Sequence, residues 1–309
     1  MDLSIVVPVY NEDECVRELH RRTVAALEST GLRFELIFVD DGSTDRTFAE
    51  LEALHAADPR VRVVKLRRNF GQTQAMRAGI DHANGERIVT MDGDLQNEPA
   101  DIPRLVARLD EGYELVTGWR RSRHDAWLSR KLPSRAANWA IARLTGVAVH
   151  DNGCSLKAYR AALIKRTPMY GEMHRFLPAM VAAGGGRIAE EVVRHHPRER
   201  GVSKYGLSRV GKVLLDMFTI KMLVTFSQRP LHWFALLSVP WIALSALFAL
   251  YFVFVRARWG EWTPVFTSLA ILCGFCVFHL LVAGLVGELI VRTGKPYGHR
   301  SANRAAAHG

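Results

Sequence analysis

From Leu3 to about Met91, short apolar runs rich in β-branched side chains alternate with longer segments of mixed polarity. The pattern predicts strands over 3–9, 34–39, 61–66, 87–91 and 114–118. The segments that begin near Asn11, Ser43 and Gly71 are predicted to be helical. Strands and helices in alternation form a mainly parallel sheet covered by helices, so the predicted fold class is α/β.

Unusual polar residues follow three of these strands. The segments are PVYNE at 8–12, DDGSTD at 40–45 and DGDLQ at 92–96. In open parallel sheets, ligands bind beyond the carboxyl ends of the strands, so we expect the three segments to converge on one crevice. No GxGxxG motif follows the first strand, which disfavours a dinucleotide-binding Rossmann site.

The DGDLQ segment carries the strongest local chemistry. Asp92 and Asp94 flank a small residue, so both carboxylates can turn toward one hard cation. Gln96 adds a neutral oxygen, and phosphates would complete the shell. The alternative is an ordinary acidic turn, because Asp-Gly pairs are common in turns. In the second segment, Asp41 can accept hydrogen bonds from a base or ribose, while residues 43–45 can cap the next helix.

The last third of the chain is much more apolar. Residues 231–255 carry no formal charge, and 264–287 hold only His279 and two thiols as ionisable groups. Each stretch exceeds the roughly 20 apolar residues that cross a bilayer. The short connection 256–263 contains Trp259 and Trp262, as a membrane interface would. The pair is therefore predicted to form a transmembrane hairpin.

The distribution of basic residues predicts the orientation of this hairpin. Lys and Arg are more frequent on both flanks than in the turn, so the catalytic part and both termini are expected in the cytoplasm. The predicted division is a catalytic domain at 1–203, amphipathic interfacial helices at 204–229, two transmembrane helices at 230–291 and a cytoplasmic tail at 292–309.

The formal charge of +10 suggests an anionic partner. Positive charge concentrates beside the apolar stretches and no nucleic-acid motif is visible, so a lipid bilayer is favoured over nucleic acid. The basic segment 120–135 suits a helix on anionic lipid or a solvated face, and 194–204 suits a loop over the site or a surface turn. His195 and His196 are interpreted as structural, and the four cysteines as small apolar residues.

SIVVPVYNE, DDGSTD and DGDLQ, in this order, resemble the family 2 glycosyltransferases, which have the GT-A fold. The DGDLQ form, the later GVSKYG and a C-terminal hairpin followed by GEL resemble the dolichyl-phosphate and undecaprenyl-phosphate sugar transferases. The resemblance implies inverting, Mg²⁺- or Mn²⁺-dependent transfer of a hexose or related sugar. The donor would be a UDP- or GDP-linked sugar and the acceptor a polyprenyl phosphate.

The resemblance also implies roles for individual residues. The nucleotide-sugar would be bound by Pro8, Tyr10, Asn11, Glu12, Val39, Asp41, Asp92, Gly93, Asp94, Gln96, Arg120 and Asp151. The metal would be held by Asp92, Asp94 and Gln96. The catalytic residues would be Asp92, Asp94, Arg120, Arg200 and Lys204. The acceptor phosphate would contact Arg130, Lys131, Arg135, Arg200, Ser203 and Lys204.

Residues 151–157, DNGCSLK, depart from the commoner Gly-Phe-Arg form of this segment. The role of Lys157 is therefore open, and Asp151 either binds a sugar hydroxyl or orients a basic side chain.

Two alternative functions would require a different sequence. A processive polysaccharide synthase needs a QxxRW motif, but Val255 stands where Gln should precede Arg258 and Trp259. An inactive scaffold predicts loss of an acidic residue in DGD, yet both are present. The sugar, the donor base and the oligomeric state, a homo-oligomer included, stay open.

Overall fold

The computed structural model describes residues 1–121, 149–167, 169, 171, 173–197, 229–261 and 264–293. The chain forms two compact units, residues 1–220 and 221–309. The predicted boundary after residue 203, the interfacial segment 204–228 and most of the predicted tail lie outside the described residues.

The first unit is built on a seven-stranded sheet with the order β3-β2-β1-β4-β6-β5-β7. Its strands are β1 (Leu3–Val9), β2 (Phe34–Asp40), β3 (Val61–Lys65), β4 (Arg87–Thr90), β5 (Leu115–Trp119), β6 (Lys157–Arg160) and β7 (Ile188–Val192). β6 runs antiparallel to both of its neighbours, and every other pairing is parallel. The predicted mainly parallel α/β sheet is confirmed.

Helices cover both faces of this sheet. They are α1 (Val16–Glu28), α2 (Thr47–Ala57), α3 (Gln72–His82), η1 (Pro99–Asp101), α4 (Ile102–Asp110), α6 (Ala161–Ile164), η3 (Met173–Arg175) and α7 (Leu177–Ala183). Alternate residues of each strand point to opposite faces, so the core has two halves. One half packs α1, α2 and α4 against the sheet, and the other packs α3, α6 and α7.

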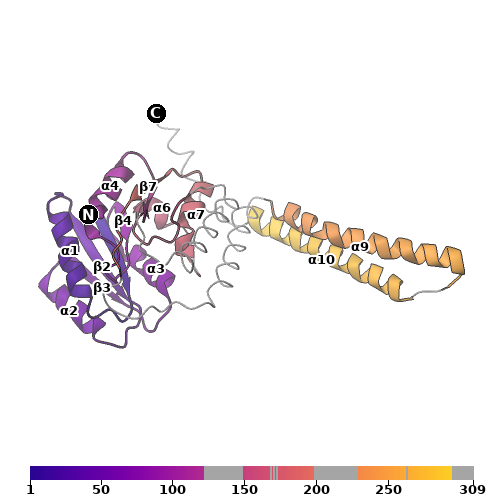
Figure 1. Cartoon of the computed structure of the whole chain (residues 1–309), viewed down its shortest axis with the longest axis horizontal. Coiled ribbons are helices and arrows are strands. Elements are labelled where there is room, and N and C mark those ends of the chain that lie inside the picture. Colours follow the sequence, from indigo (N-terminus) through magenta and orange to yellow (C-terminus); the bar gives the residue numbers. More distant parts are fainter. Residues whose placement is uncertain are drawn as a thin grey trace. The chain divides into compact units, whose positions relative to one another are not determined.

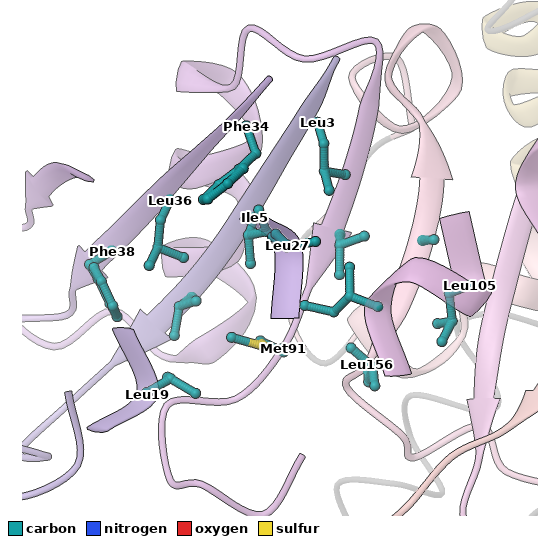
Figure 2. Close-up of a cluster of buried hydrophobic side chains, with 14 of the residues drawn as sticks. Leu3, Ile5, Leu19, Leu27, Phe34, Leu36, Phe38, Met91, Leu105 and Leu156 are labelled. Atoms are coloured by element: carbon teal, nitrogen blue, oxygen red, sulfur yellow. The ribbon is translucent and has the colours of Figure 1, made fainter. Parts of the chain in front are cut away.

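Figure 2 shows the first half of the core. Leu3 and Ile5 of β1 lie beside Phe34, Leu36 and Phe38 of β2, facing side chains of α1 and α4. These strand residues are buried, with at most 6% of their surface exposed. Both faces of the central strands are apolar because helices cover both, which explains why the sequence shows continuous apolar runs there.

The second unit contains α9 (Pro230–Trp259) and α10 (Pro264–Thr293), which lie side by side (Figure 1). Their contacts include the hydroxyl of Ser245, which donates to the carbonyl oxygen of Ala270 at 2.8 Å, and the rings of Tyr251 and Phe266, whose centroids are 4.5 Å apart. Gly260 ends α9 with a φ of 68°, a conformation that favours glycine.

Both helices of this pair are long and apolar enough to cross a membrane. Each has 30 residues, with mean hydropathy of 2.1 in α9 and 2.6 in α10 over the most apolar window, and little of either window is buried within the protein. α9 continues through Arg256 and Trp259, which the sequence had suggested for the turn. The exposed apolar surface indicates association with a membrane.

Candidate active site

The loops after β1 and β2 are hydrogen-bonded to each other. The Asn11 N–H donates to Ser43 Oγ at 3.0 Å, and the Thr44 N–H donates to Asn11 Oδ1 at 2.8 Å. The Glu12 N–H donates to Thr47 Oγ1 at 2.8 Å. Asn11 adopts a φ of 54°, which Asn tolerates better than most residues. The structure therefore brings the two predicted segments together and gives Asn11 a role in joining them.

The loop after β3 also belongs to this site. The Asp41 carboxylate accepts hydrogen bonds from the backbone N–H groups of Phe70 and Gly71 at 2.8 and 2.9 Å. Burial raises the pKa of Asp41 above its usual value, although these bonds act in the opposite direction. A Cβ on Gly42 would lie 2.5 Å from the carbonyl carbon of Arg68, so only glycine fits there. Sequence reasoning did not place residues 67–71 at the site.

The DGD turn packs directly on the end of β1. A Cβ on Gly93 would lie 2.5 Å from Val9 Cγ1, and Leu95 has a φ of 62°. The glycine therefore lets the turn approach the sheet closely, and the left-handed conformation of Leu95 bends it. This close approach places the turn that carries Asp92 and Asp94 against Pro8 and Val9, at the end of β1.

Both carboxylate oxygens of Asp92 accept hydrogen bonds from side chains. Gln72 Nε2, at the first residue of α3, donates to Oδ1 at 2.6 Å, and Ser155 Oγ donates to Oδ2 at 2.7 Å. Asn97 Nδ2 in turn donates to Ser155 Oγ at 2.8 Å. The orientation of Asp92 is thus fixed from two sides, by three residues that sequence reasoning missed because their partners are distant in the chain.

The residues of this turn fit a divalent cation. Carboxylate and amide oxygens from Asp92, Asp94 and Gln96 are the hard ligands that Mg²⁺ and Mn²⁺ prefer. Within the described residues, no group of three or more His, Cys, Asp or Glu side chains is arranged to hold a metal by itself. A cation bound here would therefore draw further ligands from the phosphates of a bound substrate.

A buried ion pair lies at the end of β5. Arg120 donates from Nε and Nη2 to the two carboxylate oxygens of Asp151, at 2.7 and 2.9 Å. The side chains are only 10% and 6% exposed. Burial alone would lower the pKa of Arg120, but the hydrogen bonds and charge of Asp151 outweigh it and raise the pKa. Of the two roles considered for Asp151, the geometry favours orientation of a basic side chain.

The segment at 194–197 is fastened beside the DGD turn. His195 forms a β-bridge with Asn97, and the His196 N–H donates to the Gln96 carbonyl oxygen at 2.9 Å. The His196 ring contacts Glu98 at 2.9 Å, and Arg194 pairs with Asp101 at 3.1 Å. These contacts agree with the structural interpretation of the two histidines.

The remaining predicted site residues divide into two groups. Pro8 lies opposite Val39 in the pairing of β1 with β2, and Tyr10 follows β1 directly. The side chain of Val39 is fully buried in the core, so only its backbone can face a ligand. The second group lies outside the described residues: Arg130, Lys131, Arg135, Arg200, Ser203 and Lys204.

Comparison with known proteins identifies relatives over nearly the whole chain. A dodecaprenyl-phosphate galacturonate synthase from Rhizobium johnstonii is 44% identical over 95% of this chain and 88% of its own length. An undecaprenyl-phosphate 4-deoxy-4-formamido-L-arabinose transferase from Edwardsiella ictaluri is 38% identical over 94% of this chain and 89% of its own.

Solved structures confirm the GT-A fold. Glucosyl-3-phosphoglycerate synthase from Mycobacterium tuberculosis, solved with Mn²⁺, uridine diphosphate and its product, matches with a TM-score of 0.57. The match covers 72% of this chain and 79% of that one at 22% identity, and a form solved with Mg²⁺ matches at 0.55.

The family model "Glycosyl transferase family 2" matches residues 4–169, which contain all three polar segments and the Arg120–Asp151 pair. The match spans more than half of the chain, and the relatives above extend the similarity through α9 and α10. The protein is a glycosyltransferase that belongs to glycosyl transferase family 2, among relatives named for polyprenyl phosphates.

Proposed function

We propose that the protein transfers a sugar from a nucleoside diphosphate, UDP or GDP, to the phosphate of a polyprenyl phosphate such as undecaprenyl or dolichyl phosphate. The observation that most supports this proposal is that the three polar segments lie at one edge of the sheet. The chain that carries them is 44% identical to a dodecaprenyl-phosphate galacturonate synthase. The two apolar helices give the protein access to a lipid acceptor.

Mg²⁺ or Mn²⁺ would be held by Asp92, Asp94 and Gln96 and, when bound, would stabilise negative charge on the leaving diphosphate. Asp92 is already oriented for this by Gln72 and Ser155. Fixed ligands lower the reorganisation needed when the donor binds. Asp41 and the joined loops after β1 and β2 would hold the nucleoside.

The acceptor changes what the protein's own residues must do. A phosphate oxygen is already anionic at neutral pH, so no side chain needs to remove a proton. This oxygen forms a bond to the anomeric carbon while the bond to the nucleoside diphosphate breaks, and the electron pair leaves with the diphosphate. Attack from the opposite side inverts the anomeric centre, and no net proton transfer occurs. The residues act by positioning two anions and offsetting their repulsion.

Membrane topology is part of the proposal. Arg229 and Arg292 flank the helix pair, while Arg256 and Arg258 lie in the last turn of α9. Together with the further basic residues of both flanks, this distribution favours a cytoplasmic catalytic unit and cytoplasmic termini.

The test is a transfer assay with the purified full chain in detergent or lipid. Undecaprenyl phosphate is supplied with radiolabelled UDP- and GDP-linked sugars, including a galacturonate, a formamido-arabinose, glucose, mannose, galactose and an amino sugar. We expect labelled lipid with one of these donors, and none when chelator is present. Transfer to a free sugar in place of the lipid, or full turnover in chelator, would contradict the proposal.

A further inference from the structure

A single short loop holds two residues of the active site at once. The loop is residues 151–156, which leads into β6. Asp151 binds Arg120 through both carboxylate oxygens, and Ser155 donates to Asp92. The position of this loop therefore decides the orientation of both Arg120 and Asp92.

The side chain of Lys157 packs against the backbone of this loop. Its ammonium donates to the carbonyl oxygen of Asn152 at 3.3 Å and to that of Cys154. Lys157 is the first residue of β6, where it pairs with Thr90 of β4 and Thr117 of β5. The lysine is therefore anchored in a strand that is paired on both sides. Its ammonium contacts the loop between Asp151 and Ser155.

Stability alone does not explain a charge at this position. Lys157 is only 2% exposed, and within the described residues its Nζ hydrogen-bonds to backbone carbonyls rather than to a carboxylate. Burial lowers the pKa of Lys157 to about 8. A charge this buried carries a large desolvation cost, and the two backbone carbonyls that accept from it supply no opposite formal charge. A cation kept there against this cost points to a role in the site.

We propose that Lys157 is a positioning residue of the donor site, which holds loop 151–156 by its carbonyl oxygens so that Asp151 and Ser155 keep Arg120 and Asp92 aligned. This inference rests on the proposed function, because it assumes that the aligned residues bind a nucleoside diphosphate with a divalent cation. Lys157 itself touches no substrate, and it acts through the loop.

Binding of UDP and of GDP, each with MnCl₂, to the full chain by calorimetry gives a readout that needs no acceptor. Lys157→Met keeps the length of the side chain and removes its N–H donors. We expect the dissociation constant to rise about 10- to 100-fold, the range for residues that orient metal ligands. Lys157→Arg, which keeps a cation with several donors, should bind more tightly than Lys157→Met.

Lys165→Met is the matched control. Lys165 also donates to a backbone carbonyl, that of Ala83 at 2.5 Å, but it follows α6 and, among the residues that the structure describes, forms no hydrogen bond with a residue of the site. Lys165→Met should therefore leave nucleotide binding unchanged. Equal binding by wild type and Lys157→Met would overturn the inference while leaving the proposed function intact. Failure of the wild type to bind either nucleotide would instead overturn the proposed function.

Ser155→Ala makes the inference testable even if Lys157→Met does not fold. This change removes only the hydroxyl that joins the loop to Asp92, and it should weaken binding of the nucleotide with Mn²⁺ by about 10-fold. Where both variants fold, the double variant should lose less binding free energy than the two single variants lose together, because both changes act on the orientation of Asp92. Wild-type binding by Ser155→Ala, or strict additivity, would contradict the inference.

Discussion

Arg120 and Asp151 form a two-point ion pair, with N–O distances of 2.7 and 2.9 Å, although 31 residues separate them in the sequence. The pair joins the end of β5 to the loop before β6. The guanidinium is therefore held in one orientation by Asp151 in the absence of any ligand.

Asp151→Asn should impair both folding stability and transfer. The change leaves the buried Arg120 without its counter-charge, which costs about 3–5 kcal/mol for a buried pair. We expect a lower melting temperature and loss of labelled lipid product. The double variant Asp151→Asn with Arg120→Met should recover part of the melting temperature without recovering transfer. Full activity in the double variant would show that the guanidinium has no part in the reaction.

Asp94→Ala should abolish transfer while the amount of folded protein in the membrane fraction is unchanged. Loss of one ligand to the cation should lower the rate about 100-fold or more, which corresponds to roughly 3 kcal/mol. Asp110→Ala is a suitable control, because Asp110 is 42% exposed and pairs with Arg87 at the surface. Activity in the Asp94 variant equal to that of the control would remove this residue from the metal site.

Gln72 offers a test of how Asp92 is oriented. Gln72→Ala removes the hydrogen bond to Asp92 Oδ1 and should weaken Mn²⁺ binding about 10-fold. Gln72→Glu keeps the shape but places a second carboxylate beside Asp92, so its affinity for the nucleoside diphosphate should fall further. Titration of Mn²⁺ in the presence of nucleotide measures the first effect, and titration of nucleotide into both variants at a fixed Mn²⁺ concentration measures the second. Identical affinities for the two variants would contradict the electrostatic part of this argument.

Lys157 should make stability depend on pH in the alkaline range. Its pKa is about 8 in the folded protein and is ordinarily 10.5, so the unfolded chain binds more protons between these values. The contribution of this group to the free energy of unfolding should therefore rise with pH from about 8 to 10.5, by about 3 kcal/mol at most. Below pH 8 the group is protonated in both states, and its contribution does not change.

The measurement compares melting temperatures of wild type and Lys157→Met from pH 7 to 10. The charged or titratable groups near Lys157 are Asp151, Arg120, Asp92, the Cys154 thiol and His174. They are common to both proteins, so their own titration largely cancels in the difference. The wild type should gain stability relative to the variant as pH rises. A difference independent of pH would show that the ammonium is not desolvated in the folded protein.

Gly79 tests the packing of α3 on the sheet. A Cβ at this position would overlap Val6 Cγ1 and lie 2.9 Å from Val39 Cγ2, both within the core. Gly79→Ala should therefore lower stability by about 1–3 kcal/mol, despite the higher helix propensity of alanine. At Gly184, an added Cβ would make ordinary contacts with the carbonyl oxygens of Val181 and Met180, at 3.4 and 3.7 Å, so Gly184→Ala should melt close to the wild type.

The sequence was sufficient to predict five of the seven strands. β1 and β2 are continuous apolar runs because both of their faces are buried, and such runs are recognisable without a structure. β6 and β7 were missed. β6 has four residues and includes Lys157 and Arg160, and β7 carries Glu190 and Glu191. Their strand conformation comes from pairing with β4 and β5, which is a tertiary effect.

The site likewise contains some features that the sequence predicts and others that depend on tertiary contacts. The motifs that end β1, β2 and β4 met as predicted, because parallel strands place their carboxyl ends at one edge. Gln72 and Ser155 were not predicted, since they bond to Asp92 across 20 and 63 residues of sequence and carry no local signal. For Lys157, the sequence shows only that it stands between the apolar residues Leu156 and Ala158. Its burial in β6 is visible in the structure alone.

The reversed strand β6 has a consequence for engineering. Trp119 ends β5 and Lys157 begins β6, and both strands are secured by hydrogen bonds to neighbours on the sheet. The two ends of the intervening chain are thus anchored independently of its length or composition. Exchanging residues 122–148 between relatives, with 149–157 retained, should therefore leave the binding of nucleotide intact.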